Sequence, residues 1–250
     1  MELKSLALKT GLVLDELVAN IEEKENYIVV RTTNRPDYFW GNYVIMKDSP
    51  SSNCCEEWCR IFEEEIGSKK DKGYIAITCD LIDTTGSDFS DFEKKGFDVS
   101  ISKVLTTNKI NRPAKYNDDI EVRAFIDKDW SKYVDIHFTS NWGYGPDDEQ
   151  KVFLKEESET FKSVVEGNKG QRYGAFLNNE MVAELGVYWK DDLVRFNNVG
   201  THPEHRRIGA CSTLVYKVSQ LLLEEDSKRT LVMEADEDYH AASIYESCLL

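Results

Sequence analysis

The chain has 250 residues, and its 31 Lys and Arg against 46 Asp and Glu give a formal net charge of −15 at pH 7. This length suits one large domain or two modest ones, with ample chain to bury a core without disulfide bonds. The acidic balance argues against sequence-independent nucleic-acid binding, which needs Lys and Arg to neutralise phosphates. A hydrophobic content of 41% argues against an intrinsically disordered chain.

The first ten residues lack the basic-then-apolar order of a signal peptide, and no apolar run approaches the ~20 residues of a membrane helix. We therefore expect a soluble, cytoplasmic protein with no membrane partner. Cys54, Cys55 and Cys59 lie close together, yet no second cysteine pair or nearby histidine completes a tetrahedral set, so we expect no metal. The six cysteines follow no disulfide-framework spacing.

The acidity is uneven along the chain. Residues 1–117 hold 16 basic and 20 acidic side chains (net −4), and residues 118–250 hold 15 and 26 (net −11), which sum to −15. Residues 106–118 are polar, contain Arg112-Pro113 and show no apolar periodicity, so we place a domain boundary there. The predicted domains span residues 1–112 and 119–250.

In the first half, apolar periodicity predicts a helix over residues 6–21. A second helix is expected between Ser51 or Ser52 and Gly67, and a short third one over residues 89–95. Strands are expected at residues 27–31, 38–46, 74–79 and 97–105.

In the second half, a strand at 120–125 precedes two helices, the second of them over residues 153–165. Three strands follow in quick succession, joined by Asn178-Asn179 and by Asp191-Asp192, which suit tight antiparallel hairpins. The remaining elements are an amphipathic helix from Cys211 to Leu222, a strand at 230–235 and a helix from about Tyr239. This order predicts an α/β or α+β fold with a mixed sheet and helices on its faces.

The segment Thr201 to Cys211 lies between a strand and the amphipathic helix. A helix N-terminus attracts anions through its unpaired N–H groups and its positive dipole end. Gly209 lets a ligand approach the backbone, and Arg206 and Arg207 add positive charge to an acidic region. The segment therefore predicts an anion site, most plausibly for a pyrophosphate, and a basic loop that merely enters a helix is the plainer alternative. G-x-x-x-x-G-K-[ST], G-x-G-x-x-G and G-x-S-x-G are all absent, which weakens nucleotide-binding and hydrolase interpretations.

Residues 196–220 resemble the acyl-CoA-binding motif of the GCN5-related N-acetyltransferases (GNAT), Q/R-x-x-G-x-G/A, which follows a strand and opens a helix. Arg206 matches its first position and Gly209 its middle glycine, while Cys211 stands where the family has Gly or Ala. Residues 236–247 resemble the family's second motif, a helix with an Ala-x-x-Ile/Leu pattern before a Tyr. The resemblance implies the GNAT fold, an acyl-CoA N-acyltransferase fold, over residues 119–250.

The first half resembles the same family only in outline. Residues 92–97 are similar to its Tyr-x-x-x-Gly-Phe ending, but residues 38–74 contain no R-x-x-G-x-G/A loop. We interpret residues 1–112 as a degenerate GNAT-like α/β domain without a cofactor site, and an unrelated α/β domain is the alternative. The whole chain then resembles a tandem two-domain acetyltransferase.

The resemblance implies direct transfer of an acetyl group from acetyl-CoA to a primary amine of a small molecule or peptide in a ternary complex. Trp142 and Tyr144 would line the pocket for that acceptor. The residues expected to hold the cofactor are Val199, Gly200, Thr201, Arg206, Arg207, Ile208, Gly209, Ala210 and Cys211.

Tyr245 matches the family's position for the acid that protonates the departing thiolate, and a tyrosine pKa of about 10 exceeds the thiol's, about 8.5. A core aromatic on an amphipathic helix is the alternative for this residue. Glu184 is one candidate for the general base, because an inward carboxylate is costly unless it is used or paired. Asn197 and Asp236 are the others, and a structural role is the alternative for each.

The family's final helix continues into two further strands, whereas this chain reads Glu246-Ser-Cys-Leu-Leu250 and stops. Without these strands the acceptor side of the sheet is incomplete unless the first half or another subunit, as in a homodimer, covers the exposed edge. Two functional hypotheses follow: an N-acetyltransferase, or a non-catalytic acyl-CoA-binding or interaction module.

Overall fold

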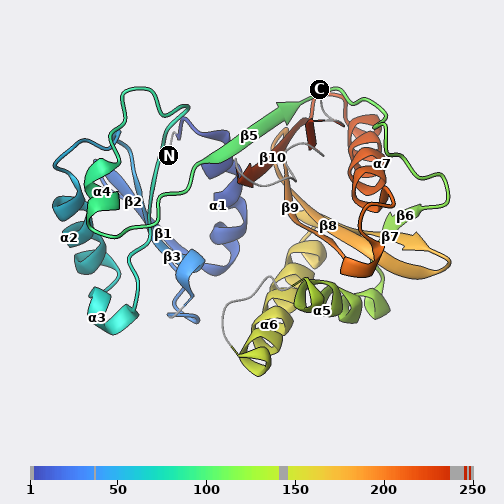
Figure 1. The fold of residues 1–250 in the computed structure, drawn as a ribbon, viewed down its shortest axis with the longest axis horizontal. Coiled ribbons are helices and arrows are strands. Elements are labelled where there is room, and N and C mark those ends of the chain that lie inside the picture. Colours follow the sequence, from blue (N-terminus) through green and yellow to red (C-terminus); the bar gives the residue numbers. More distant parts are fainter. Residues whose placement is uncertain (1–2, 37, 141–145, 237–244, 247, 249–250) are drawn as a thin grey trace. The chain divides into compact units, whose positions relative to one another are not determined.

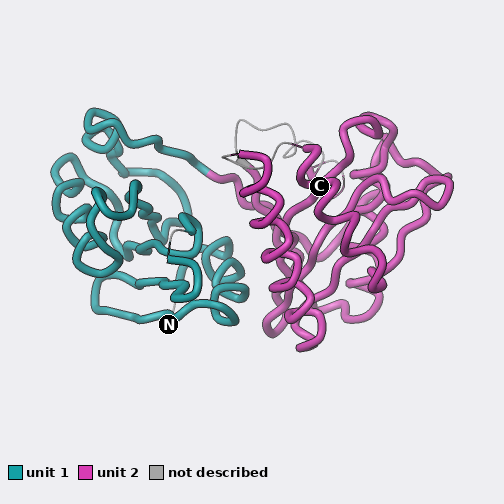
Figure 2. The backbone as a smooth tube through the Cα atoms, turned by 90° about the horizontal axis from the view of Figure 1, so that it is seen from below, with its two compact units in different colours: residues 1–101 teal, residues 102–250 magenta. Residues whose placement is uncertain are grey.

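The computed structural model describes residues 3–36, 38–140, 146–236, 245–246 and 248. Contacts divide the chain into two compact units, residues 1–101 and 102–250, which Figure 2 colours separately. Both units combine a mixed sheet with helices, which confirms the predicted α/β class. Among the described helices, none has the length and apolar character needed to cross a membrane.

The first unit contains a sheet in the order β1-β2-β3-β4, in which β4 is parallel to β3 and the other neighbours are antiparallel. Leu12 of α1 packs with Ile28 and Ile45, while Trp58 and Phe62 of α2 belong to a second buried cluster. The elements are α1 (Leu6–Val18), β1 (Asn20–Glu23), β2 (Tyr27–Arg31), β3 (Asn42–Met46), α2 (Cys55–Glu65), α3 (Lys69–Lys72), β4 (Ile77–Cys79) and α4 (Ser90–Lys94).

The second unit contains a sheet in the order β5-β10-β9-β8-β7-β6, with α7 on one face and α5 and α6 on the other (Figure 1). Among the described strands of this sheet, β9 and β10 are the one parallel pair, and the other neighbours are antiparallel. The elements are β5 (Ser102–Thr107), β6 (Glu121–Ala124), α5 (Trp130–Thr139), α6 (Asp147–Glu166), β7 (Gly170–Leu177), β8 (Glu180–Lys190), β9 (Leu193–Thr201), α7 (Ala210–Glu225) and β10 (Thr230–Asp236).

The apolar face of α7 builds the main core of this unit. Leu214, Val215, Val218 and Leu222 are buried in one cluster with inward residues of the central strands, as the i, i+3, i+4 spacing predicts. The hairpin between β7 and β8 also forms as predicted, with Asn178 at φ 52° and Asn179 at φ 67°. These two positive φ angles explain the Asn-Asn pair, because Asn tolerates the left-handed region.

The two units share an order of elements. In each, a helix precedes three antiparallel strands, a second helix and then a strand parallel to the third: α1-β1-β2-β3-α2-β4 in the first and α6-β7-β8-β9-α7-β10 in the second. The first unit has the additional short helix α3 between α2 and β4. In the first unit β3 and β4 stay paired up to Met46, the last residue of β3, so these two parallel strands do not separate before β3 ends. This repeat is consistent with the tandem organisation that the resemblance implies.

The structure departs from the expected elements at several places. The first helix ends at Val18, and Ile21 belongs to β1. The prediction extended the helix to residue 21 because Ile21 follows Leu17 by four residues, the spacing of one helical face. Helix α6 begins at Asp147 rather than at 153, since its first turn is acidic and favoured by the helix dipole instead of apolar packing. The strand expected at 97–105 lies at Ser102–Thr107 and pairs with β10 in the second unit, so the units divide after Ile101, ahead of the predicted boundary.

Candidate active site

The parallel strands β9 and β10 part within the sheet. They pair only from Thr230 with Leu193 to Val232 with Arg195, although β9 continues to Thr201 and β10 to Asp236. The register between β8 and β9 shifts between Glu184 and Gly186, and Asn198 sits opposite this shift with φ 45°. A bulge of this kind bends its strand. The result is an opening between two strands whose backbone groups face each other without pairing.

The opening leads toward the N-terminus of α7. A short 3-10 turn, Pro203–His205, precedes Arg207 at φ 66° and Gly209 at φ 84°, and the helix begins at Ala210. Backbone N–H groups around left-handed residues form concave anion-binding surfaces, and the first turn of a helix adds donors without intrahelical acceptors. The side chains of Arg206 and Arg207 are exposed here. These residues fit a bound pyrophosphate.

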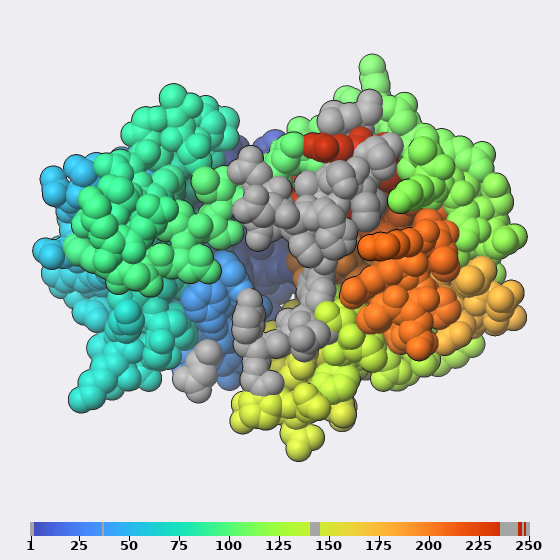
Figure 3. Space-filling model, viewed as in Figure 1, coloured from blue at the N-terminus to red at the C-terminus, as the bar shows by residue number. Residues whose placement is uncertain are grey.

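Gly209 is also required by the fold itself. A Cβ at this position would lie 2.4 Å from the carbonyl oxygen of Lys115. That carbonyl accepts a hydrogen bond from Ser212 Oγ at 2.8 Å, and Asn117 Nδ2 donates to the Ile208 carbonyl at 2.9 Å. Figure 3 shows the segment around residue 115 in green near the orange surface of α7. The ligand approach that the sequence suggested is therefore not the sole reason for this glycine.

Cys211 replaces the family's small residue at the third motif position. Burial raises the pKa of its thiol to about 12, against a weak opposing effect of a hydrogen bond with Thr201. A thiol with such a pKa stays protonated at neutral pH and is a poor nucleophile. Cys211 therefore acts as a small, neutral residue at the start of α7.

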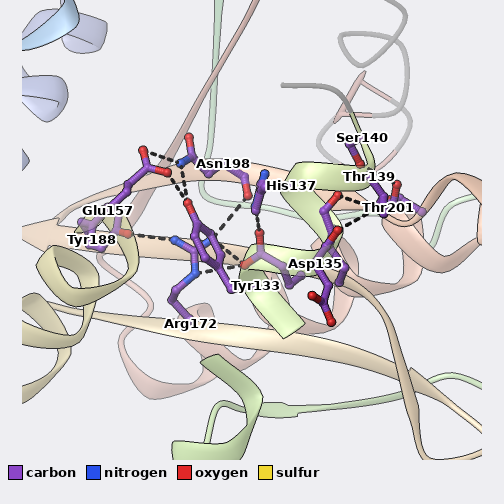
Figure 4. A network of polar contacts seen from close by, with 12 residues as sticks. Tyr133, Asp135, His137, Thr139, Ser140, Glu157, Arg172, Tyr188, Asn198 and Thr201 are labelled. Carbon is purple, nitrogen blue, oxygen red and sulfur yellow. Dashed lines mark hydrogen bonds and ion pairs between the residues drawn. The ribbon is translucent and has the colours of Figure 1, made fainter. Parts of the chain in front are cut away.

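A buried polar network lies on the opposite face of the sheet, against α5 and α6 (Figure 4). Arg172 of β7 and Glu184 of β8 are both fully buried and form an ion pair, with Arg172 Nε 2.9 Å from Glu184 Oε2. The other carboxylate oxygen, Oε1, is hydrogen-bonded to Nε2 of the buried His137. Both oxygens of Glu184 are thus engaged inside the protein.

The guanidinium of Arg172 is enclosed on every side by polar or aromatic partners. Its Nη1 donates to Tyr188 Oη at 3.1 Å, and its Cζ lies 4.6 Å from the ring centre of Tyr133 and 4.7 Å from that of Phe161. Gly186 provides the room, because a Cβ there would lie 2.8 Å from Arg172 Nη1. Such pairing offsets the large desolvation cost of a buried charge.

The network reaches the bulge in β9. Arg172 Nη2 lies 3.4 Å from the Asn198 carbonyl oxygen, and Asn198 Nδ2 lies 3.4 Å from both Tyr133 Oη and Glu157 Oε1. Tyr133 also donates to Glu157, and burial together with that carboxylate raises the pKa of Tyr133 well above its usual value. Tyr133 therefore remains a neutral donor, and the network supports Asn198 beside the opening.

The other expected site residues are placed as follows. Tyr245 is buried in the cluster beneath α7, in a helical stretch with Glu246. Asn197 lies in the opened stretch of β9, and its buried Oδ1 has no hydrogen-bond partner among the described residues. Trp142 and Tyr144 lie outside the described residues, as does the side chain of Asp236. The structure therefore brings the residues expected to hold a cofactor together at one end of the opening and sets Glu184 apart in the interior.

Sequence reasoning missed His137, Arg172, Tyr133 and Glu157. These residues come from α5, β7 and α6, and no local motif connects them. Arg172 carries one signal, because it is a charged residue inside a strand whose later residues, Ala175 to Leu177, are apolar. An inward arginine in such a strand needs a buried carboxylate, and Glu184 on the adjacent strand is the natural partner.

The comparisons with known proteins agree with this geometry. Residues 130–248 match the model of the "Acetyltransferase (GNAT) family". The second unit therefore belongs to the GNAT acetyltransferase family, a class of acyltransferases, as its motif predicts.

Solved structures extend the likeness to both units. A functionally unknown conserved protein from Staphylococcus epidermidis is 12% identical, with 92% of this chain and 88% of that chain covered and a TM-score of 0.67. A GCN5-related N-acetyltransferase from Kribbella flavida is 9% identical, with 94% and 86% covered and a TM-score of 0.60. At these identities the likeness shows the fold. No curated protein matches the sequence.

Replacing Gly209 with Ala is expected to destabilise the protein without any ligand. The left-handed φ alone costs about 1–2 kcal/mol for a residue with a Cβ, and the Lys115 carbonyl adds a clash. We expect the melting temperature without ligand to fall by several degrees in calorimetry, whereas Gly11→Ala, which has open space around its Cβ, leaves it unchanged or higher. An unchanged melting temperature for Gly209→Ala would contradict the packing role.

Replacing Glu184 tests its place in the network. Glu184→Ala leaves the Arg172 guanidinium buried without a counter-charge, which costs about 3–5 kcal/mol in the free energy of unfolding. The exposed Glu180→Ala on the same strand should change it by less than about 0.5 kcal/mol. Denaturant unfolding measures both. A Glu184→Ala variant as stable as the wild type would show that the ion pair contributes little.

Proposed function

We propose that the second unit transfers an acetyl group from acetyl-CoA to a primary amine of a small molecule or peptide. The observation that carries the proposal is the opening between β9 and β10, which leads to the N-terminus of α7. An elongated ligand with an anionic end matches this arrangement. The match of residues 130–248 to an acetyltransferase family supports acyl-CoA as that ligand.

The cofactor roles follow from position. The backbone N–H groups from Arg207 to Cys211 would hold the pyrophosphate, with the two exposed arginines adding charge-assisted hydrogen bonds. The unpaired stretch of β9 from Val199 to Thr201 would align the pantetheine chain by strand-like hydrogen bonds. Asn197 Oδ1 offers a buried acceptor in the same stretch for an N–H of the ligand.

The chemistry is an attack of the neutral amine on the thioester carbonyl. The carbon–nitrogen bond forms, the carbon–sulfur bond breaks, the nitrogen loses one proton to water, and the CoA thiolate leaves with a proton from an acid. We assign that acid to Tyr245, on the strength of its motif position. The acidity of the C-terminal half, net −11, favours the approach of cationic amines.

The geometry favours a positioning role for Glu184 over direct contact with the amine. Both its oxygens are engaged by His137 and Arg172, and its side chain has no exposed surface. Through Arg172 it holds the Asn198 carbonyl at the bulge. The proton of the incoming ammonium would then leave through water or another group.

The anion site is tested by the double variant Arg206→Ala/Arg207→Ala. Loss of two charge-assisted contacts should weaken acetyl-CoA binding about tenfold in calorimetric titration, without a change in the melting temperature of the free protein. The control is Lys228→Ala, which removes an exposed cation just after the C-terminal end of α7. This variant should bind acetyl-CoA as the wild type does. If the wild type shows no binding at millimolar acetyl-CoA, the proposed function fails.

The acid is tested by Tyr245→Phe. Acetyl-CoA affinity should stay within about twofold, while kcat for thiol release with a panel of amines should fall about 100-fold, the usual contribution of a general acid. The alkaline fall of the wild-type kcat should also disappear, because Phe has no proton to lose. Tyr216→Phe, whose ring packs on Tyr116, is the control. Binding without any thiol release in the wild type would favour the non-catalytic acyl-CoA module instead.

A further inference from the structure

The strand β5 stands at the junction of the two units. The first unit ends at Ile101, and β5 begins at the next residue and pairs antiparallel with β10 along the whole of Ser102–Thr107. The same strand follows α4, the last helix of the first unit, but is built into the sheet of the second. β5 therefore forms the edge of the second unit's sheet beside β10.

β5 supports the part of β10 that β9 leaves unpaired. β9 pairs with β10 only through Val232, so that residues 233–236 find their ladder partners, among the described strands, in β5 alone. This stretch forms one wall of the opening assigned to the pantetheine chain. Of the six residues of β5 only Leu105 is buried, so β5 binds β10 mainly through backbone hydrogen bonds and not through side-chain packing.

The segment around β5 also contacts the C-terminal residues. Lys103 forms an ion pair with Glu246, and the N–H of Asn111 donates to the Cys248 carbonyl at 2.8 Å. Cys248 Sγ in turn lies 3.6 Å from the Ser212 carbonyl oxygen in the first turn of α7. Tyr245 immediately precedes the residue that Lys103 holds.

We propose that β5 and its flanking residues are a positioning element of the acyl-CoA site, supplied by the segment that leads out of the first unit. β5 fixes the free half of β10 as one wall of the opening, and Lys103 and Asn111 fix the segment that carries Tyr245. This inference rests on the proposed function for the identity of the ligand.

The main test places proline at adjacent residues of β5 in the full chain. In an edge strand one residue directs its N–H to β10 and the next directs it away, so Lys103→Pro and Val104→Pro interrupt the ladder in one case and spare it in the other. Lys103→Ala and Val104→Ala control for the lost side chains. We expect the proline variant that interrupts the ladder to bind acetyl-CoA about tenfold more weakly than the alanine variant at the same position. The proline variant that spares the ladder should have the same affinity as the alanine variant at its position. Unchanged affinity in both proline variants would overturn the proposal.

The contact with the C-terminal segment is tested by charge exchange, which also serves if the interrupting proline prevents folding. Lys103→Glu should lower kcat about threefold, the size of an exposed ion pair, with acetyl-CoA affinity unchanged, and Lys103→Glu/Glu246→Lys should restore it. If kcat of the double variant is no higher than that of Lys103→Glu, Lys103 is not part of the positioning element.

Hydrogen exchange separates this inference from the proposed function. The interrupting proline should abolish protection of those amides of residues 233–236 that donate to β5 and leave that of 230–232, whether or not acetyl-CoA binds. A wild type that does not bind acetyl-CoA refutes the function on its own. Full protection of 233–236 in both proline variants, each of them folded, refutes the role of β5.

Discussion

The parting of β9 from β10 is the constraint on which the second unit depends. Two neighbouring parallel strands that pair at only three positions leave backbone N–H and C=O groups without the ladder that normally satisfies them. Each strand therefore needs support from its other side. The bulged part of β9 rests on polar groups of β7, α5 and α6, and the free part of β10 rests on β5. The opening exists because both supports are present.

The support beneath β9 contains an ion pair whose two side chains are fully buried. A fully buried Arg172 and Glu184 are tolerated because the ion pair, His137, Tyr188 and two aromatic rings together replace their water. An apolar filling would pack as tightly, but it would offer no donor to the Asn198 carbonyl. The directional bonds of the network thus hold a backbone conformation, φ 45° at Asn198, that packing alone would not specify.

Local patterns in the sequence predict the parts of the fold that local forces determine. The Asn178-Asn179 turn, the apolar stripe of α7 and the glycine and arginines of the loop before it are readable because each depends on neighbouring residues. The family motif then extends the prediction to the fold of the second unit. The pairing of Arg172 with Glu184 joins different strands, and the role of Lys115 beside Gly209 joins residues far apart in sequence. Such contacts leave no periodic trace.

The place of β5 limits how far the two halves of this chain are interchangeable. Domain boundaries normally lie in polar, irregular stretches such as residues 106–118. A cut there would leave β5 with the N-terminal half, although β5 belongs to the sheet of the C-terminal half. The halves repeat one order of elements, but they are not self-sufficient copies. Sequence change in the first half is therefore constrained by the second through at least this strand, even though the first half has no acyl-CoA motif of its own.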